Sequence, residues 1–92
     1  MQQIILNEKL ILSFEPSGKK IRLVITEADD ELVCRKETLK NLQHFLAEER
    51  AHVFKGRLQL KKHDDIVEVF IKDIPAAIIS ANSFREVLNN LQ

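Results

Sequence analysis

Apolar and polar residues alternate along two stretches near the start of the chain, residues 9–14 and 20–27. Alternation with a period of two is typical of strands that bury one face. The segment between them, residues 15–19, contains Pro16 and Gly18, which favour a hairpin turn. Residues 28–30 are a second polar turn, and residues 31–35 are predicted to form a short third strand.

The next segment has the periodicity of a helix. Thr38 is a plausible N-cap, because its hydroxyl can accept a hydrogen bond from an early backbone N–H group. Apolar residues then recur at helical spacing and form one stripe, made by Leu39, Leu42, Phe45 and Leu46. The polar residues 48–50 end this pattern.

The second half of the chain follows the same order. Residues 53–62 are predicted to form a strand in which Gly56 marks a bulge or a close approach of backbone. A turn at residues 63–65 leads to a strand at 66–72, and Pro75 precedes a short strand at 76–80. Ser83 and Glu86 fit a capping box at the start of a final helix. The buried stripe of that helix is predicted to be Phe84, Val87, Leu88 and Leu91.

Both halves therefore read as strand, strand, strand, helix, over residues 8–50 and 53–92. The two predicted N-caps, Thr38 and Ser83, lie 45 positions apart, and several apolar residues match at that offset. The hypothesis is an internal β-β-β-α duplication. The alternative is that any two amphipathic helices that follow strand meanders would align in this way.

These elements predict one α+β domain over residues 1–92, since a chain of this length does not hold two independent cores. We expect one antiparallel sheet of about six strands with both helices packed on one face. The competing arrangement is two three-stranded sheets, each with its own helix.

The repeated order of elements resembles the duplicated sheet-plus-helix folds of single-strand-binding proteins of the Pur-alpha and Whirly type. The resemblance covers the whole chain as topology, without a shared sequence motif. Those proteins use four strands in each unit, and residues 3–6 would supply the additional strand in the first half. Because a fold alone does not carry function, the resemblance assigns no site residue.

Composition supports a folded chain: 45% of the residues are hydrophobic and 30% are charged. The formal net charge is zero, which argues against a strongly basic nucleic-acid binder. The chain has no Trp or Tyr, so base-stacking aromatic residues could come only from five Phe and three His.

The expected compartment is the cytoplasm. The first apolar run, residues 4–6, is too short for a secretory signal, and no run approaches the length of a membrane span. A lone cysteine, Cys34, allows no internal disulfide and is compatible with a reducing environment.

The pattern does not indicate catalysis, a metal site or a cofactor. His44, His52 and His63 lack the spacing of a helical zinc site, and the acidic residues 29–31 and 64–65 do not match a calcium loop. Cys34 precedes Arg35, which could activate a thiol, but the sequence places no histidine beside it as a base. We therefore expect a protein that is not an enzyme.

Apolar residues on the outward side of the strands suggest a contact surface. Ile11, Val24 and Phe70 are predicted to point away from the helices and to form a patch for a protein partner or a second copy of the chain. If the sheet curls, these residues belong to the core instead. The predicted function is a small non-catalytic binding module that acts by protein–protein contact or homodimerisation.

Basic residues on the same predicted face provide the alternative function. Single-stranded DNA or RNA could bind a strand face that combines cations with an aromatic residue. The residues proposed for that face are Lys20, Arg22, Arg57, Lys61 and Lys72. Strand lysines and arginines also serve simply to keep sheet edges from pairing.

Overall fold

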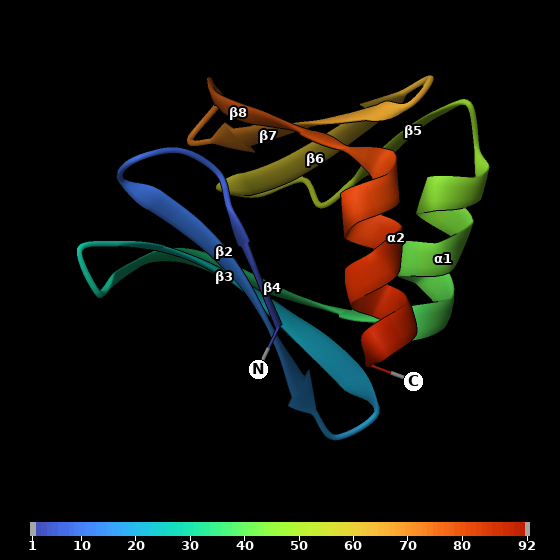
Figure 1. Cartoon of the computed structure of the whole chain (residues 1–92), viewed down its shortest axis with the longest axis horizontal. Coiled ribbons are helices and arrows are strands. Elements are labelled where there is room, and N and C mark those ends of the chain that lie inside the picture. Colours follow the sequence, from blue (N-terminus) through green and yellow to red (C-terminus); the bar gives the residue numbers. More distant parts are fainter. Residues whose placement is uncertain (1, 92) are drawn as a thin grey trace.

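The computed structural model describes residues 2–91, which form eight strands and two helices (Figure 1). The first half consists of β1 (Gln2–Ile5), β2 (Leu10–Ser17), β3 (Lys20–Glu27), β4 (Asp30–Thr38) and α1 (Leu39–Ala47). The second half consists of β5 (Arg50–Val53), β6 (Leu58–His63), β7 (Ile66–Ile71), β8 (Ile74–Ser80) and α2 (Ala81–Asn90). No helix among residues 2–91 is long and apolar enough to cross a membrane.

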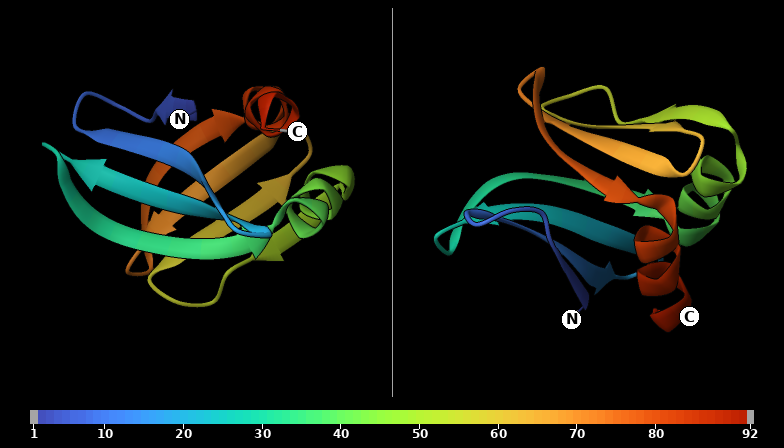
Figure 2. Two further views of the ribbon diagram at one scale, coloured as in Figure 1. Left: turned by 90° about the horizontal axis from the view of Figure 1, so that it is seen from below. Right: turned by 45° about the horizontal axis from the view of Figure 1, so that its top comes forward.

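The strands form two antiparallel sheets of four strands each, sheet A from β1 to β4 and sheet B from β5 to β8. Figure 2 shows the sheets stacked on each other, with the two helices side by side at one end. The predicted α+β class with antiparallel strands and two helices is confirmed. The single sheet of about six strands is wrong, because the strands divide into two sheets whose apolar faces meet in one core that both helices also cover.

Short strands at the start of each sheet account for the difference in strand number. β1 pairs with β2 from Gln2 opposite Phe14 to Ile5 opposite Ile11, so the additional strand considered for residues 3–6 exists. β5 pairs with β6 in the same way. Each half therefore has four strands before its helix, which is the strand number that the Pur-alpha and Whirly resemblance implies.

One hydrophobic cluster contains buried residues from both sheets and both helices. Phe84 of α2 packs edge-on against Phe14 of β2, with ring centroids 5.2 Å apart and planes at 89°. Phe45 of α1 lies 6.3 Å from the same Phe84 ring. These aromatic contacts join the second helix to the first half of the chain, so the two halves share their interior.

The last hairpin of each sheet has the same local geometry. Ala28 and Asp29 join β3 to β4 with φ values of 52° and 71°, and Lys72 and Asp73 join β7 to β8 with φ values of 52° and 67°. Two consecutive positive φ values define the type I′ turn, whose twist matches that of paired strands. Each hairpin also has a bulge after its second residue pair from the turn.

The two helices begin directly where a strand ends. The Thr38 hydroxyl accepts a hydrogen bond from the Asn41 N–H at 3.1 Å, which confirms the predicted N-cap of α1. The predicted N-cap of α2 is wrong: Ser80, not Ser83, is the N-cap, and its hydroxyl accepts from the Ser83 N–H at 3.0 Å. The helix starts earlier because β8 stays paired up to Ser80 and the Ala81 N–H donates to the Asp65 carbonyl.

The predicted strand over residues 53–62 is interrupted, so β5 ends at Val53 and β6 begins at Leu58. Phe54 has a φ of 69°, which turns the chain and buries its ring in the core. The guanidinium carbon of Arg35, on β4, lies 5.5 Å from the centre of that ring. A Cβ on Gly56 would lie 2.7 Å from Arg35 Nη1, so a larger residue at this position would displace the end of the flexible Arg35 side chain.

Candidate functional site

The three residues predicted to form one contact patch lie on two opposite surfaces. Ile11 and Val24 are on the outer face of sheet A, and Phe70 is on the outer face of sheet B. Because the inner faces of the two sheets pack together, their outer faces point away from each other (Figure 1). The prediction of a continuous patch that contains all three residues is therefore wrong.

Val24 is also not available for contact. Alternation assigns it correctly to the outer face, yet only 3% of its surface is exposed and it lies outside the shared hydrophobic cluster. Its cross-strand neighbours are Ser13 and Cys34. The Arg22 guanidinium binds Glu31, whose partner on β3 is Thr26. Val24 lies between Arg22 and Thr26 on the same face of β3, so the Arg22 side chain passes over Val24.

Arg22 is held by two carboxylates on the outer face of sheet A. Its Nη1 donates to Glu15 Oε1 at 3.2 Å, and its Nη2 donates to Glu31 Oε1. The hydrogen bond to Glu31 raises the pKa of the Arg22 guanidinium above its ordinary value, so the group stays charged. An arginine with two carboxylate partners is poorly placed to bind phosphate as well.

The five basic residues proposed for nucleic-acid binding are not gathered on one face. Lys20 and Arg22 belong to β3 of sheet A, whereas Lys61 belongs to β6 of sheet B. Arg57 lies in the β5–β6 loop and Lys72 in the β7–β8 turn. The predicted single basic face is wrong for the same reason as the patch: the strands belong to two sheets instead of one.

The outer face of sheet B combines ionisable and apolar side chains. His52, Lys61, Glu68 and Ile78 are aligned across its four strands. A shallow hollow of about 540 Å³ lies over the β5–β6 side of this row. It is lined by Arg50, Ala51, His52, Lys61, Lys62, His63 and Glu68.

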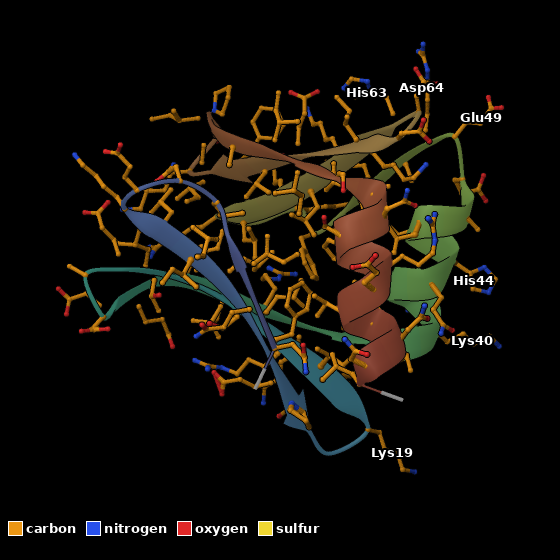
Figure 3. The ribbon with its side chains drawn as sticks, viewed as in Figure 1. Lys19, Lys40, His44, Glu49, His63 and Asp64 are labelled. Carbon is orange, nitrogen blue, oxygen red and sulfur yellow. The ribbon has the colours of Figure 1, made fainter. Side chains whose placement is uncertain are left out.

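Two contacts order the polar side chains on this face. His63 Nε2 lies 2.5 Å from Glu68 Oε1, and Figure 3 shows His63 on the outer surface of sheet B. Lys61 Nζ lies 4.7 Å from the centre of the Phe70 ring, within the range of a cation–π contact. One side of the Phe70 ring therefore lies beside the positive charge of Lys61.

Apolar side chains occupy the β7–β8 side of the same face. Ile78 is 63% exposed on the edge strand β8, and Pro75 is exposed opposite the half-buried Phe70. Ile66 is half-buried on β7. Ile78 and Pro75 were not among the predicted contact residues, because no faces were assigned to the last strand. The alternation around the buried Ile79 could have placed Ile78 outward.

The residues considered for catalysis or metal binding are spread over the fold. Cys34 is an exposed free thiol on β4, His44 is on α1, and His52 and His63 are on sheet B. In the part of the chain that the structure describes, no three His, Cys, Asp or Glu side chains come together as a metal-binding group. The outer face of sheet B, which combines exposed apolar side chains with ionisable ones, is the candidate functional site.

Comparison with models of protein families, with curated proteins and with solved structures finds no match for the chain. The resemblance in element order to the Pur-alpha and Whirly type thus transfers no binding residue.

Proposed function

We propose that this protein is a small non-catalytic binding module that contacts another protein surface through the outer face of sheet B, with a second copy of the chain as the first candidate. This sheet B face is defined by its outward residues on β5 to β8. They are Arg50, His52, Gln59, Lys61, His63, Ile66, Glu68, Phe70, Pro75, Ile78 and Ser80.

The observation that carries the proposal is the exposed apolar side of this face. Ile78 exposes 63% of its surface to solvent beside Phe70 and Pro75, although the chain has a large interior in which such side chains are normally buried. Protein interfaces have a centre that is poor in charge and rich in apolar and aromatic residues, with a polar rim. On this face the apolar side chains lie along the β7–β8 side, with His63, Glu68 and Lys61 as a polar margin on one side of them.

The composition of the face also suits a second copy. The face carries Arg50 and Lys61 together with the Glu68 carboxylate, and the chain has a formal net charge of zero, so the electrostatic repulsion between two copies is small. A stable interface needs about 800 Å² from each partner. The accessible surface of the protein is 5854 Å², so the contact must cover most of the sheet B face, including its ionisable side chains.

The test is the molecular mass in solution, measured by light scattering over a wide concentration series. The wild type is expected to associate as concentration rises, because apolar surface is removed from water. Ile78→Glu should keep the mass of one chain, since it places a charge in the contact. Ile5→Glu is the matched control, because Ile5 is 74% exposed but belongs to sheet A.

A wild type that remains monomeric at every concentration contradicts self-association. Equal loss of association in Ile5→Glu and Ile78→Glu contradicts the assignment to sheet B. Circular dichroism of each variant separates a lost contact from a lost fold.

Single-stranded nucleic acid is a second candidate ligand for the same face, favoured by the Lys61–Phe70 contact. An aromatic ring with an adjacent cation can stack a base and contact its phosphate. If this face binds nucleic acid, the anisotropy of a labelled oligonucleotide rises and the affinity falls steeply with salt, and Lys61→Glu weakens it more than Lys20→Glu. Absence of binding at low salt contradicts this candidate.

We also propose that the two halves arose by duplication and that the protein acts in the cytoplasm. The matching type I′ turns and the matching bulges of the β3–β4 and β7–β8 hairpins support the first proposal. The offset is 44 residues from Ala28 to Lys72 and 42 residues between the caps Thr38 and Ser80, in place of the expected 45. The free thiol of Cys34 supports the second proposal.

A further inference from the structure

The edge of β4 differs from the other three sheet edges. β1 and β5 have only four residues each, so they offer few edge groups to a partner. β8 carries Pro75, which lacks an N–H donor. β4 is the longest strand, with nine residues and no proline, and Figure 2 shows it as the outermost strand of sheet A.

The register shows which backbone groups lie on this edge. Two-residue hairpin turns close both ends of β3, so its residues bond alternately to β2 and to β4. Val33 and Arg35 direct their N–H and C=O groups to β3, whereas Cys34 and Lys36 direct theirs to the free edge. Within residues 2–91, no hydrogen bond is formed to those edge groups of Cys34 and Lys36.

A hollow of about 310 Å³ runs along the same edge. It is bounded by residues 31–35 of β4 on one side and by Arg57 and Leu58 on the other, where the β5–β6 loop enters β6. A strand added to β4 would therefore place side chains against Arg57. Leu32, 38% exposed, adds an apolar contact within the hollow.

The charges at this edge determine which partner fits. Glu31 is bound by Arg22, and Glu37 accepts hydrogen bonds from the Thr38 N–H and from Asn41. By contrast, Arg35, Lys36 and Arg57 form no ion pair with a carboxylate among the described residues. Asp30 and Glu37 also form no ion pair among the described residues, but they lie near the two ends of β4 and outside the hollow. The unpaired charges that line the hollow are those of Arg35 and Arg57, so two β4 edges would repel each other there and an acidic segment would be attracted.

We propose that the free edge of β4 binds an extended, acidic segment of another protein, which joins sheet A as an additional antiparallel or parallel strand. The main-chain groups of Cys34 and Lys36 form the strand hydrogen bonds, and Arg57 and Arg35 bind the acidic side chains. This site is independent of the sheet B face, because none of the outward residues that define that face lines the hollow. The alternative is that the basic residues at this edge serve only to prevent aggregation, in which case the protein would bind no such segment.

The test uses short fluorescein-labelled peptides that alternate valine and glutamate, with the glutamates in either register. Matched peptides carry lysine in place of glutamate, or the same glutamates with N-methylated backbone amides. The acidic peptide should bind the full chain, as measured by anisotropy. Bound peptide should also slow hydrogen exchange at the Cys34 and Lys36 amides, with no change at the β5 edge.

Two charge reversals in the same loop separate recognition from general attraction. Arg57→Glu should weaken binding by about tenfold or more, because it removes a charge-assisted hydrogen bond at the hollow. Lys55→Glu makes the same charge change two positions away, outside the lining of the hollow, and should weaken binding clearly less.

Three results overturn the proposal. One is that no acidic peptide binds, and another is that the N-methylated peptide binds as well as the unmodified one, which would leave only charge attraction. The third is that peptide binds while exchange at Cys34 and Lys36 is unchanged. Both variants lie in an exposed loop, and their circular dichroism spectra establish that the fold is retained.

Discussion

Lys62 is a buried lysine that satisfies its charge with backbone carbonyl groups. It is 7% exposed, and its Nζ donates to the Glu48 carbonyl at 2.6 Å and to the Asp64 carbonyl at 2.7 Å. Glu48 is the C-cap of α1, where the carbonyl groups of a helix favour a cation. Lys62 thus fastens the end of α1 to the β6–β7 turn.

Replacement of this lysine by methionine tests its role. Lys62→Met keeps a similar side-chain volume but leaves two carbonyl groups without a donor, so it should lower the free energy of unfolding by about 1–3 kcal/mol. Lys55→Met is the control: Lys55 is exposed in a loop, and its loss should change stability by no more than about 0.5 kcal/mol. Urea unfolding measures both, and equal stability of the two variants would contradict this role.

Single residues show what alternation can and cannot predict. The pattern assigned Val24 to the outer face of its strand, which is correct, but its burial depends on the path of the Arg22 side chain. That path is set by Glu15 on β2 and Glu31 on β4, which become neighbours only when the sheet forms. In the same way, alternation places Lys62 on the same strand face as Leu60 and Leu58, but it does not reveal which carbonyl groups accept its hydrogen bonds.

The start of α2 shows how a local pattern can mislead about an element. Ser83 and Glu86 have the spacing of a capping box, yet Ser83 lies inside the helix. The Ala81 N–H is bonded to the Asp65 carbonyl, so the strand pairing of β8 ends where the helix begins. Tertiary pairing, which no local pattern contains, moved the helix start by three residues.

Two alanine substitutions distinguish these N-caps. Ser80→Ala removes the acceptor of the Ser83 N–H and should destabilise the protein by about 0.5–2 kcal/mol. Ser83→Ala removes only its side-chain contact with the Ser80 hydroxyl, so its effect should be clearly smaller. Thermal unfolding compares the two, and a larger loss for Ser83→Ala would show that the helix starts at the later residue.

Strand and helix positions were largely predictable, because the core face of each long element repeats at a fixed period. β3 lies at the predicted residues 20–27, and α1 follows its predicted cap. β1 and β5 were harder to identify, since four residues give too little alternation. The break between β5 and β6 depends on the positive φ of Phe54, an unfavourable conformation for that residue that the sequence does not announce.

The arrangement of the strands into two sheets decides where the binding surfaces lie. Alternation predicts which side chains share a face of one strand, but it does not state which strands share a sheet. Ile11 and Phe70 were therefore expected on one surface and lie on two. The sheet B face and the β4 edge arise only from the assembled fold, since both combine residues from segments that are distant in sequence.

We propose that the sheet B face, and not the outer face of sheet A, mediates self-association. Isoleucine-methyl NMR over a concentration series tests it directly, because exposed or half-buried isoleucines mark both outer faces. If the sheet B face mediates self-association, the methyl signals of Ile66 and Ile78 shift with concentration and those of Ile5 and Ile11 do not. Shifts at Ile5 and Ile11 without any at Ile78, or spectra that do not depend on concentration, would contradict it.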